Sequence, residues 1–392
     1  SLPGGEMVAE KLRLRAYRGF EQGPIRPPSE AGSLLIRITR NCPWNRCSFC
    51  PVYKGAEFSL RPVDDVLEDI NRVHGYVQAL RDALDRRGRL LHEDVVALTG
   101  KASDRAAAGA AVQWARAGMQ SIFLQDANSL VIKPERLIAI LDHLRRCFPW
   151  VTRITSYARS HTIARISPEN LRQIALSGLN RIHIGMESGS DEVLARVKKG
   201  VDKATHILAG RRVKEAGMEL SEYLMPGLGG RELSTEHARE SADALNQINP
   251  DFIRLRTLAL PTHVELYREQ QEGRFTPLTD VEMVRELVVF CQSLKGITSR
   301  LASDHILNLF EDLDGRYPED KARLLALLQG FLELGPEEQM LYRVGRRLGL
   351  FRSLTDLADQ PSRNQVSETC LRLGITPANV DQAVAELTRR FI

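Results

Sequence analysis

The stretch that decides the fold runs Arg40-Asn-Cys-Pro-Trp-Asn-Arg-Cys-Ser-Phe-Cys-Pro51 and holds Cys42, Cys47 and Cys50 in the pattern C-x4-C-x2-C. It follows directly on an apolar, strand-like run that begins at Leu34. Thiols this close together commonly form a disulfide or bind a metal, and an odd number of them favours a metal. A structural zinc ion and an electron-transfer iron–sulfur cluster each take four ligands.

A fourth thiol is not near this stretch, because Cys147, Cys291 and Cys370 are isolated in helical or apolar surroundings. Three thiolates on a four-iron cluster would leave one iron open, and an open metal position is typical of catalysis. A zinc site completed by a distant histidine or aspartate is the alternative interpretation.

The same run resembles the cluster loop of the radical S-adenosylmethionine (SAM) superfamily. The resemblance implies that Cys42, Cys47 and Cys50 hold a [4Fe–4S] cluster whose fourth iron is chelated by SAM. Phe49 matches the aromatic residue that this superfamily places near the adenine. Most members have three residues between the first two cysteines, whereas this chain has four, and that spacing excludes the most common subfamilies.

Composition describes an ordinary globular protein of 392 residues, with 43% hydrophobic residues, 27% charged residues and a net charge of +4. The small net charge gives only weak support to a nucleic-acid partner. Apolar runs stay short of the ~20 residues that a membrane span needs. The cysteine usage and the absence of a recognisable secretory signal favour a cytoplasmic location.

Strands and helices alternate along most of the chain, and this alternation is typical of parallel βαβ units. The resemblance implies the partial (β/α)6 TIM-like barrel of radical SAM enzymes, and periodicity independently gives six strands. We expect strands at 34–39, 121–124, 151–157, 181–186, 220–225 and 252–258, and helices from 63 onward and at 134–147, 168–177, 192–217 (interrupted near Gly200) and 234–248.

Three regions follow from this pattern: an irregular lead-in over 1–32, a barrel over 33–310 and a helical C-terminal extension over 311–392. Residues 88–118 are interpreted as an insertion with an alanine-rich helix from Ser103. The short apolar run Val95–Leu98 within it is a candidate seventh strand.

Polar residues follow the second and third strands, where a parallel barrel places its chemistry. In the run after the second strand, Gln125, Asp126 and Asn128 resemble the Asn-Ser version of the superfamily's turn for the SAM amino group. Asp126 or Asn128 would accept from that ammonium, and an ordinary helix N-cap is the alternative. Near the end of the third strand, Ser156 and Arg159 are candidates, because a guanidinium matches the SAM carboxylate.

The fourth and fifth strands end in two further matches. The run I-G-M-E-S-G-S-D-E-V-L at 184–194 resembles the ribose-binding strand end of the branch with the methylthiotransferases, the Elongator catalytic subunit and the cobalamin-dependent members. It implies that Glu187 accepts from the ribose hydroxyls, with Ser188 in support. The glycine-rich run beginning at Met225 and Gly227 corresponds to the loop against the adenine, where glycine permits close approach.

Other polar groups admit two interpretations. Arg254 and Arg256 lie two apart and so share a strand face; they bind a substrate anion if that face is interior and are ordinary surface if it is not. Asp304 and His305, in a segment expected at a sheet edge near the barrel mouth, are candidate acid/base or substrate-orienting groups, and a surface or capping pair is the alternative. The run Lys198-Lys199-Gly200 also resembles the same superfamily branch, although a lysine pair is typical of a solvated helix face.

Beyond residue 314 the sequence predicts helices at 319–334, 336–348, 353–358, 364–373 and 377–391. This extension has no cysteine cluster, which argues against an auxiliary iron–sulfur cluster. Its basic residues, at helical spacing, are interpreted as a solvated face: Arg343, Arg346, Arg347, Arg389 and Arg390.

The resemblance implies that a reduced cluster cleaves SAM to methionine and a 5′-deoxyadenosyl radical, which abstracts hydrogen from a substrate. A reductant such as flavodoxin or ferredoxin is the implied partner. A small molecule is the favoured substrate, with RNA as the alternative. A zinc or iron–sulfur binding module without catalysis is the competing hypothesis, and iron content separates it from the enzyme.

Overall fold

The computed structural model describes residues 17–391, which form two compact units. The N-terminal unit comprises residues up to Pro43 together with 56–158 and 168–181. The C-terminal unit comprises, of the described residues, 44–55, 159–167 and 182–391. The cysteine loop is therefore divided, with Cys42 in the N-terminal unit and Cys47 and Cys50 in the C-terminal unit.

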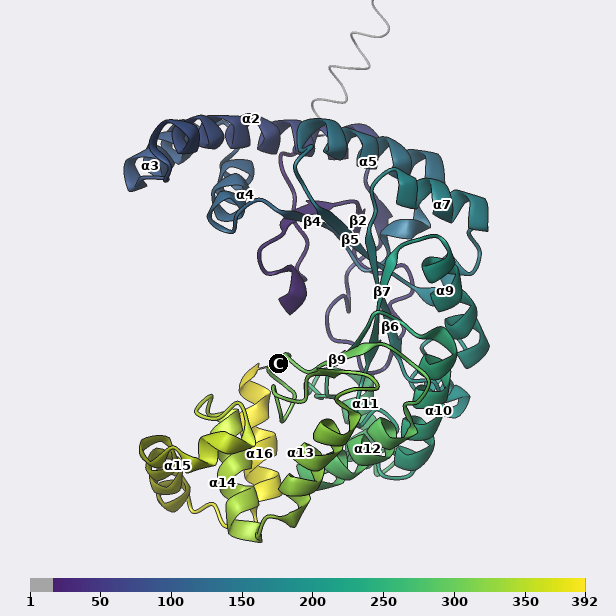
Figure 1. The fold of residues 1–392 in the computed structure, drawn as a ribbon, viewed down its shortest axis with the longest axis vertical. Coiled ribbons are helices and arrows are strands. Elements are labelled where there is room, and N and C mark those ends of the chain that lie inside the picture. Colours follow the sequence, from purple (N-terminus) through teal and green to yellow (C-terminus); the bar gives the residue numbers. More distant parts are fainter. Residues whose placement is uncertain (1–16, 392) are drawn as a thin grey trace, which may run out of the picture. The chain divides into compact units, whose positions relative to one another are not determined.

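The N-terminal unit is built on three parallel strands in the order β1-β4-β5, in which Leu34 pairs with Ile122 and Ile122 with Ile154. Its elements are η1 (Pro28–Glu30), β1 (Leu34–Arg37), β2 (Thr39–Arg40), β3 (Ser59–Leu60), α2 (Val63–Arg87), α3 (His92–Lys101), α4 (Arg105–Arg116), β4 (Ser121–Gln125), η2 (Ser129–Val131), α5 (Pro134–Cys147), β5 (Arg153–Ala158) and α7 (Pro168–Leu176). Helix α2 packs on both α4 and α5 (Figure 1).

Helix α3 contains the run Val95–Leu98, so the strand considered for these residues is wrong. Helix α3 begins after Leu91, where the Asp94 carboxylate accepts from the backbone N–H at 3.0 Å. None of its residues is buried, and half-exposed apolar residues on a short helix do not have the burial that a central strand requires. The alanine-rich helix is confirmed as α4, in which Ala107, Ala108 and Ala111 are buried.

The C-terminal unit has the strand order β6-β7-β8-β9-β10. Its elements are α6 (Ser160–Ile163), β6 (Arg181–Glu187, in this unit from Ile182), α8 (Asp191–Arg196), α9 (Lys203–Glu215), β7 (Glu219–Leu224), α10 (Ser234–Ile248), β8 (Phe252–Leu255), α11 (Glu265–Gln271), α12 (Asp280–Ser293), β9 (Arg300–Ala302), β10 (Gly315–Arg316), α13 (Lys321–Glu333), α14 (Pro336–Arg347), η3 (Leu354–Ala358), α15 (Gln360–Leu373), α16 (Val380–Thr388) and η4 (Arg389–Phe391). Figure 1 shows α14, α15 and α16 together at the C-terminal end of this unit.

Six predicted strands are confirmed as β1, β4, β5, β6, β7 and β8, and the fold is the expected α/β partial barrel with a helical C-terminal extension. A further strand, β9, pairs in parallel with β8 and antiparallel with β10. The segment from Ser299 to His305 thus contributes a strand inside the sheet, and the sheet edge predicted there is formed by β10 instead. Within the described residues, no helix has the length and apolar character of a membrane span.

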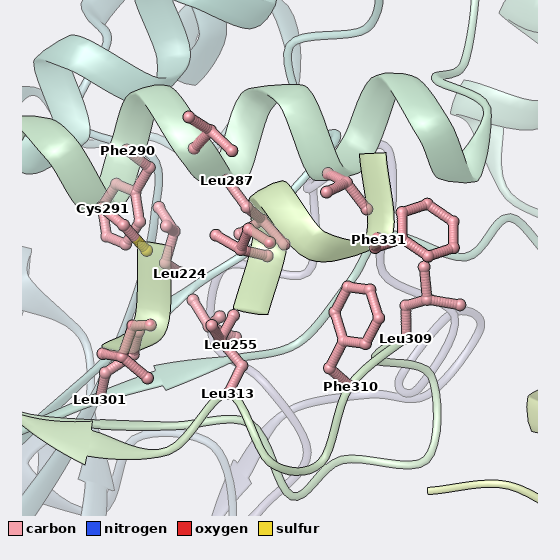
Figure 2. Close-up of a cluster of buried hydrophobic side chains, with 14 of the residues drawn as sticks. Leu224, Leu255, Leu287, Phe290, Cys291, Leu301, Leu309, Phe310, Leu313 and Phe331 are labelled. Atoms are coloured by element: carbon pink, nitrogen blue, oxygen red, sulfur yellow. The ribbon is translucent and has the colours of Figure 1, made fainter. Parts of the chain in front are cut away.

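One hydrophobic core in the C-terminal unit joins the strands to the helical extension. In Figure 2, Leu287, Phe290 and Cys291 of α12 point toward strand residues such as Leu224 and Leu255. The cluster continues through Phe310 and Phe331, whose rings meet edge-on at 5.4 Å, and on to Tyr342 and Val384 of the last helices. The helices after residue 311 are therefore packed on the same core as β7 and β8.

Candidate functional site

The loop that carries Cys47 and Cys50 is held in place by backbone hydrogen bonds to distant parts of the C-terminal unit. The Ser48 N–H donates to the Val197 carbonyl at 3.0 Å, and the Ser48 carbonyl accepts from the Leu266 N–H at 2.9 Å. The Cys50 N–H donates to the Cys47 carbonyl at 3.3 Å, which closes a tight turn between the two thiols. A loop tied at both ends in this way presents two cysteines from a fixed backbone.

Trp44, in the four-residue spacer, packs against the turn after α8. Its indole Nε1 donates to the Lys198 carbonyl at 2.7 Å, and the Arg159 guanidinium carbon lies 5.1 Å from the ring centroid. Gly200 has φ +73°, and a Cβ there would lie 2.4 Å from the indole. The predicted helix interruption near Gly200 is thus confirmed, and it makes room for Trp44. Arg159 also donates to the Lys199 carbonyl.

Lys199 belongs to the site, and its interpretation as a solvated helix residue is wrong. Its side chain is only 12% exposed, because it extends between the Phe49 ring and the Glu187 carboxylate, at 5.9 Å and 3.7 Å. Lys198 is about half exposed and fits the earlier interpretation. The pair is split because the left-handed turn at Lys198, φ +57°, directs the two neighbours differently.

Glu187, the last residue of β6, adopts φ +66°, a conformation uncommon for a residue with a side chain. Its carbonyl accepts from the Met225 N–H at 3.0 Å, so the ends of β6 and β7 are joined. Strained backbone of this kind clusters at functional sites. The sequence match at 184–194 therefore coincides with a local outlier in the structure.

Ser188 is fully buried and bonded within the protein. Its Oγ lies 2.8 Å from Nδ1 of His237, whose Nε2 lies 2.9 Å from the Met225 carbonyl. His237, on α10, thereby connects the residue after β6 with the residue after β7. Sequence reasoning missed His237, because a single histidine in a helix of small residues carries no motif.

The glycine-rich run after β7 is fixed by α12. The Gly227 N–H donates to Oε1 of Glu286 at 2.8 Å, and a Cβ on Gly227, at φ +87°, would lie 2.6 Å from the methyl carbon of Met283. The positive φ is the feature that favours glycine at 227, because the Met283 methyl is the end of a flexible side chain. Glu286, like His237, is marked by no sequence motif.

Two distant motifs meet at one small cavity of about 30 Å³ in the C-terminal unit. Phe49 and Cys50 of the cysteine loop line it together with Met225, and Arg256, Leu258 and Leu307 contribute other parts of the wall. Arg254, by contrast, is buried with its Nε 3.2 Å from Ser221 Oγ. Strand β8 ends at Leu255, and Arg256, one residue further on, donates its backbone N–H to the Leu224 carbonyl at 3.0 Å.

In the N-terminal unit, Asp126 holds the start of the cysteine loop. Its Oδ2 accepts from Arg37 at 2.7 and 2.9 Å and from the Asn41 N–H at 2.7 Å, while its buried Oδ1 has no hydrogen-bond partner among the described residues. Burial raises the pKa of this carboxyl above its ordinary value despite the opposing effects of Asn41 and Arg37. Oδ1 is therefore an available acceptor on a side chain whose other oxygen is bonded to Asn41, the residue before Cys42.

The other N-terminal candidates are bonded differently. The Gln125 side chain accepts from the Gly23 N–H at 2.8 Å and donates to the Ile25 carbonyl at 2.5 Å, so it ties down the lead-in segment. Ser156 Oγ donates to the Tyr157 carbonyl at 2.9 Å. Asn128 precedes η2 without a capping bond from its side chain, which does not fit the N-cap alternative for this residue.

Asp304 and His305 differ from each other in environment. Asp304 is exposed, whereas His305 is largely covered and its Nδ1 accepts from the Leu307 N–H at 3.2 Å. Burial, then the nearby Arg256, lower the pKa of His305 to about 4. The imidazole is therefore neutral at pH 7, a form that can accept or donate one hydrogen bond but carries no charge.

The donor set fits an iron–sulfur cluster by its chemistry. None of the six cysteines, all within residues 17–391, forms a disulfide, and Cys42, Cys47 and Cys50 span nine residues. No group of three or more histidine, cysteine or acidic side chains in the described chain is gathered into a ready metal site.

Curated relatives share between a fifth and a quarter of their aligned residues with this chain. The tRNA uridine(34) acetyltransferase of Methanocaldococcus infernus is 26% identical over 142 residues, 35% of this chain and 26% of that protein. The heme chaperone HemW of Bacillus subtilis is 22% identical over 157 residues, 40% of this chain and 41% of that protein. The chain thus spans well under half of these relatives, and no family model matches it.

Solved structures with a similar fold include coproporphyrinogen III oxidase HemN of Escherichia coli, described as a radical SAM enzyme, with a TM-score of 0.45, 14% identity and 91% and 82% of the two chains covered. The methyltransferase TsrM of Kitasatospora setae, a radical SAM protein with a bound [4Fe–4S] cluster, has a TM-score of 0.41 and 16% identity, with 67% of this chain and 38% of that chain covered. These relatives and structures are consistent with the radical SAM superfamily, which is the family recognised from the cysteine loop and whose members bind the expected cofactors, a [4Fe–4S] cluster and SAM.

Proposed function

We propose that this protein is a radical SAM enzyme that abstracts a hydrogen atom from a small organic substrate. The observation that carries the proposal is the cavity lined jointly by Phe49 and Cys50 and by Met225, residues of two motifs that are about 175 positions apart. Cys47 is buried and Cys50 is partly buried, and both pack with Met225 in one hydrophobic cluster, so the cysteine loop and the glycine-rich run form one wall. The juxtaposition is the one that a SAM molecule chelated to a cluster would need.

Cys42, Cys47 and Cys50 would hold the cluster through their thiolates. The cluster would supply one electron, taken from an external reductant of the flavodoxin or ferredoxin class, for the reductive cleavage of SAM. The chain's own residues bind SAM in one pose and keep water away from it.

Glu187 is proposed to accept hydrogen bonds from the ribose hydroxyls. Its side chain is only 14% exposed and lies 3.7 Å from Lys199, and its two carboxylate oxygens can accept from two hydroxyls. Ser188 and His237 are proposed as positioning residues, because their hydrogen bonds link the ends of β6 and β7. Asp126, through Oδ1, and Asn128 stay proposed acceptors for the SAM ammonium, and Arg159 the proposed partner of its carboxylate.

An RNA substrate is the second candidate. It is favoured by the named activities of the archaeal tRNA uridine(34) acetyltransferase and of the mouse mitochondrial tRNA methylthiotransferase CDK5RAP1, which is 26% identical over 237 residues, 57% of this chain and 36% of that protein. A net charge of +4 over 392 residues gives this alternative little support. RNA affinity that falls steeply with salt would favour it over a small molecule.

The test is anaerobic purification and reconstitution, followed by measurement of iron, sulfide and zinc in the wild type, Cys50→Ala and Cys147→Ala. Cys147 is a half-buried cysteine on α5 and serves as the matched control. We expect about four irons per chain in the wild type and in Cys147→Ala, and a large loss in Cys50→Ala. Zinc in place of iron would contradict the proposal. Thiols without disulfides fit a reducing compartment, and we propose the cytoplasm.

A further inference from the structure

A cavity of about 280 Å³ in the C-terminal unit has a wall made by the helical extension. Helices α11, α12, α14 and α16 surround it together with the segment that follows β8. Its volume lies near the lower end of small-molecule pockets, which begin at about 300 Å³.

This cavity adjoins the smaller one that Cys50 lines. Thr257, Leu258, Ala259 and Leu307 belong to the walls of both. The two cavities are therefore neighbours that share part of their walls. Hydrogen abstraction requires a substrate close to the SAM-derived radical, and a cavity that adjoins the Cys50 side is a suitable place to hold one.

Two arginines of α14 bring positive charge into the wall. Arg343 is 4% exposed and Arg347 is 6% exposed, and both pair with Asp280, at 3.0 and 3.3 Å. Arg343 also pairs with Asp381 at 2.5 Å, but the Asp381 side chain is 59% exposed and its charge is screened by water. One buried carboxylate thus faces two buried guanidinium groups.

Arg347 has donor capacity left over. Its Nη1 donates to the Leu307 carbonyl at 3.0 Å and its Nη2 to Asp280, while its Nε is buried without a hydrogen-bond partner among the described residues. The Nε atom itself has almost no accessible surface, so a ligand in the cavity would meet the combined positive charge of Arg343 and Arg347 rather than this atom. A planar carboxylate matches a guanidinium edge.

The interpretation of the α14 arginines as a solvated face is wrong. Arg346 is also buried, and it donates to the Asn308 carbonyl and pairs with Glu311. Only Arg389 and Arg390 are exposed as expected. Helical spacing alone could not show that α14 packs on the segment 305–309, which supplies carbonyl acceptors and so turns a basic face inward.

The remaining wall is largely apolar, with Leu258, Leu260, Leu278, Met283 and Val384 among its residues. We propose that the helical extension, residues 311–392, forms a substrate pocket for a small carboxylic acid with an apolar body, whose carboxylate is bound by Arg347. This inference rests on the proposed function for the identity of the ligand as substrate. The pocket itself can be tested without turnover.

The test measures binding of 3-phenylpropionate and of its uncharged analogue 3-phenylpropionamide to the reconstituted full chain by calorimetry. We expect the carboxylate to bind about tenfold more tightly than the amide, or better, because a hydrogen bond to a charged group distinguishes them. Arg347→Gln should reduce this ratio toward one. Ala385→Trp fills the cavity from an exposed position on α16 and should abolish binding of both probes.

Glu386→Trp is the matched control, because Glu386 is the exposed neighbour that does not line the cavity. Equal affinity for the two probes, no binding of the carboxylate, or unchanged binding in Ala385→Trp would each overturn the pocket. If Arg347→Gln fails to fold, comparison of Ala385→Trp with Glu386→Trp still tests whether the probes bind in this cavity. Formation of 5′-deoxyadenosine without added substrate is measured separately, so that failure of the proposed function and failure of the pocket are distinguished.

Discussion

Substitution of Gly200 by alanine should disturb the cysteine loop from a position that touches neither a cysteine nor SAM. Gly200 has φ +73°, and the added Cβ would lie 2.4 Å from Trp44, well inside van der Waals contact. Trp44 lies between Cys42 and Cys47 in the sequence and is fixed by its bond to the Lys198 carbonyl. The indole must move, and the spacer between two proposed ligands moves with it.

The expected magnitude has two parts. A left-handed conformation costs an alanine about 1–2 kcal/mol relative to glycine. Overpacking against a ring that is already in contact adds about 1–3 kcal/mol. Gly217 provides the matched control, because it has φ +85° but nothing within 4 Å of an added Cβ. Gly217→Ala should therefore lose only the first part.

The assay is equilibrium unfolding in denaturant together with iron content after reconstitution. We expect Gly200→Ala to be less stable than Gly217→Ala and to retain less iron, while Gly217→Ala retains the iron of the wild type. Equal stability of the two variants, with full iron in both, would refute the reasoning that Gly200 exists to make room for Trp44.

Three further outcomes follow from buried charges. Burial, then the nearby Glu187, raise the pKa of Glu222 well above 4.5, so the folded state holds a proton that the unfolded state releases. The free energy of unfolding should therefore fall by up to about 1.4 kcal/mol per pH unit above pH 4.5. Glu222→Gln should flatten this fall when unfolding is measured from pH 5 to 8, and a wild-type slope in the variant would count against the prediction. Asp280→Asn should lower the free energy of unfolding by about 3–5 kcal/mol, because Arg343 and Arg347 stay buried without their shared carboxylate. Glu311→Gln, at a part-exposed ion pair, should lower it by under about 1 kcal/mol. Similar losses in the two variants would contradict this prediction. Glu187→Gln should weaken SAM binding about 10- to 100-fold in calorimetry while the iron content stays unchanged. Glu192→Gln, at an exposed position, should leave SAM binding unchanged. Unaltered SAM affinity in Glu187→Gln would contradict the assignment of Glu187 to the ribose site.

The strands and helices were largely predictable because their signals are local. Hydrophobic periodicity predicts the helix from Val63 and the strand ends at Gln125 and Glu187, and a glycine predicts the interruption near Gly200. The exceptions are short apolar runs: Val95–Leu98 reads as strand or helix equally well, and only its lack of burial decides for helix.

The site was predictable where a motif marked it and not where packing created it. The sequence singled out Glu187 and Met225, but nothing local shows that His237 would bridge them or that Glu286 would hold Gly227. Lys199 and Arg347 were misjudged for one reason. A charged residue on a helix is exposed to solvent unless another segment packs over it, and that packing depends on the tertiary structure rather than on the local sequence.

The most direct test of the account is the formation of 5′-deoxyadenosine by the reconstituted protein, incubated anaerobically with SAM and dithionite and analysed by chromatography. The account predicts 5′-deoxyadenosine and methionine in equal amounts from the wild type, and none above background from Cys50→Ala. Intact SAM in the presence of a fully reduced, four-iron cluster would contradict it.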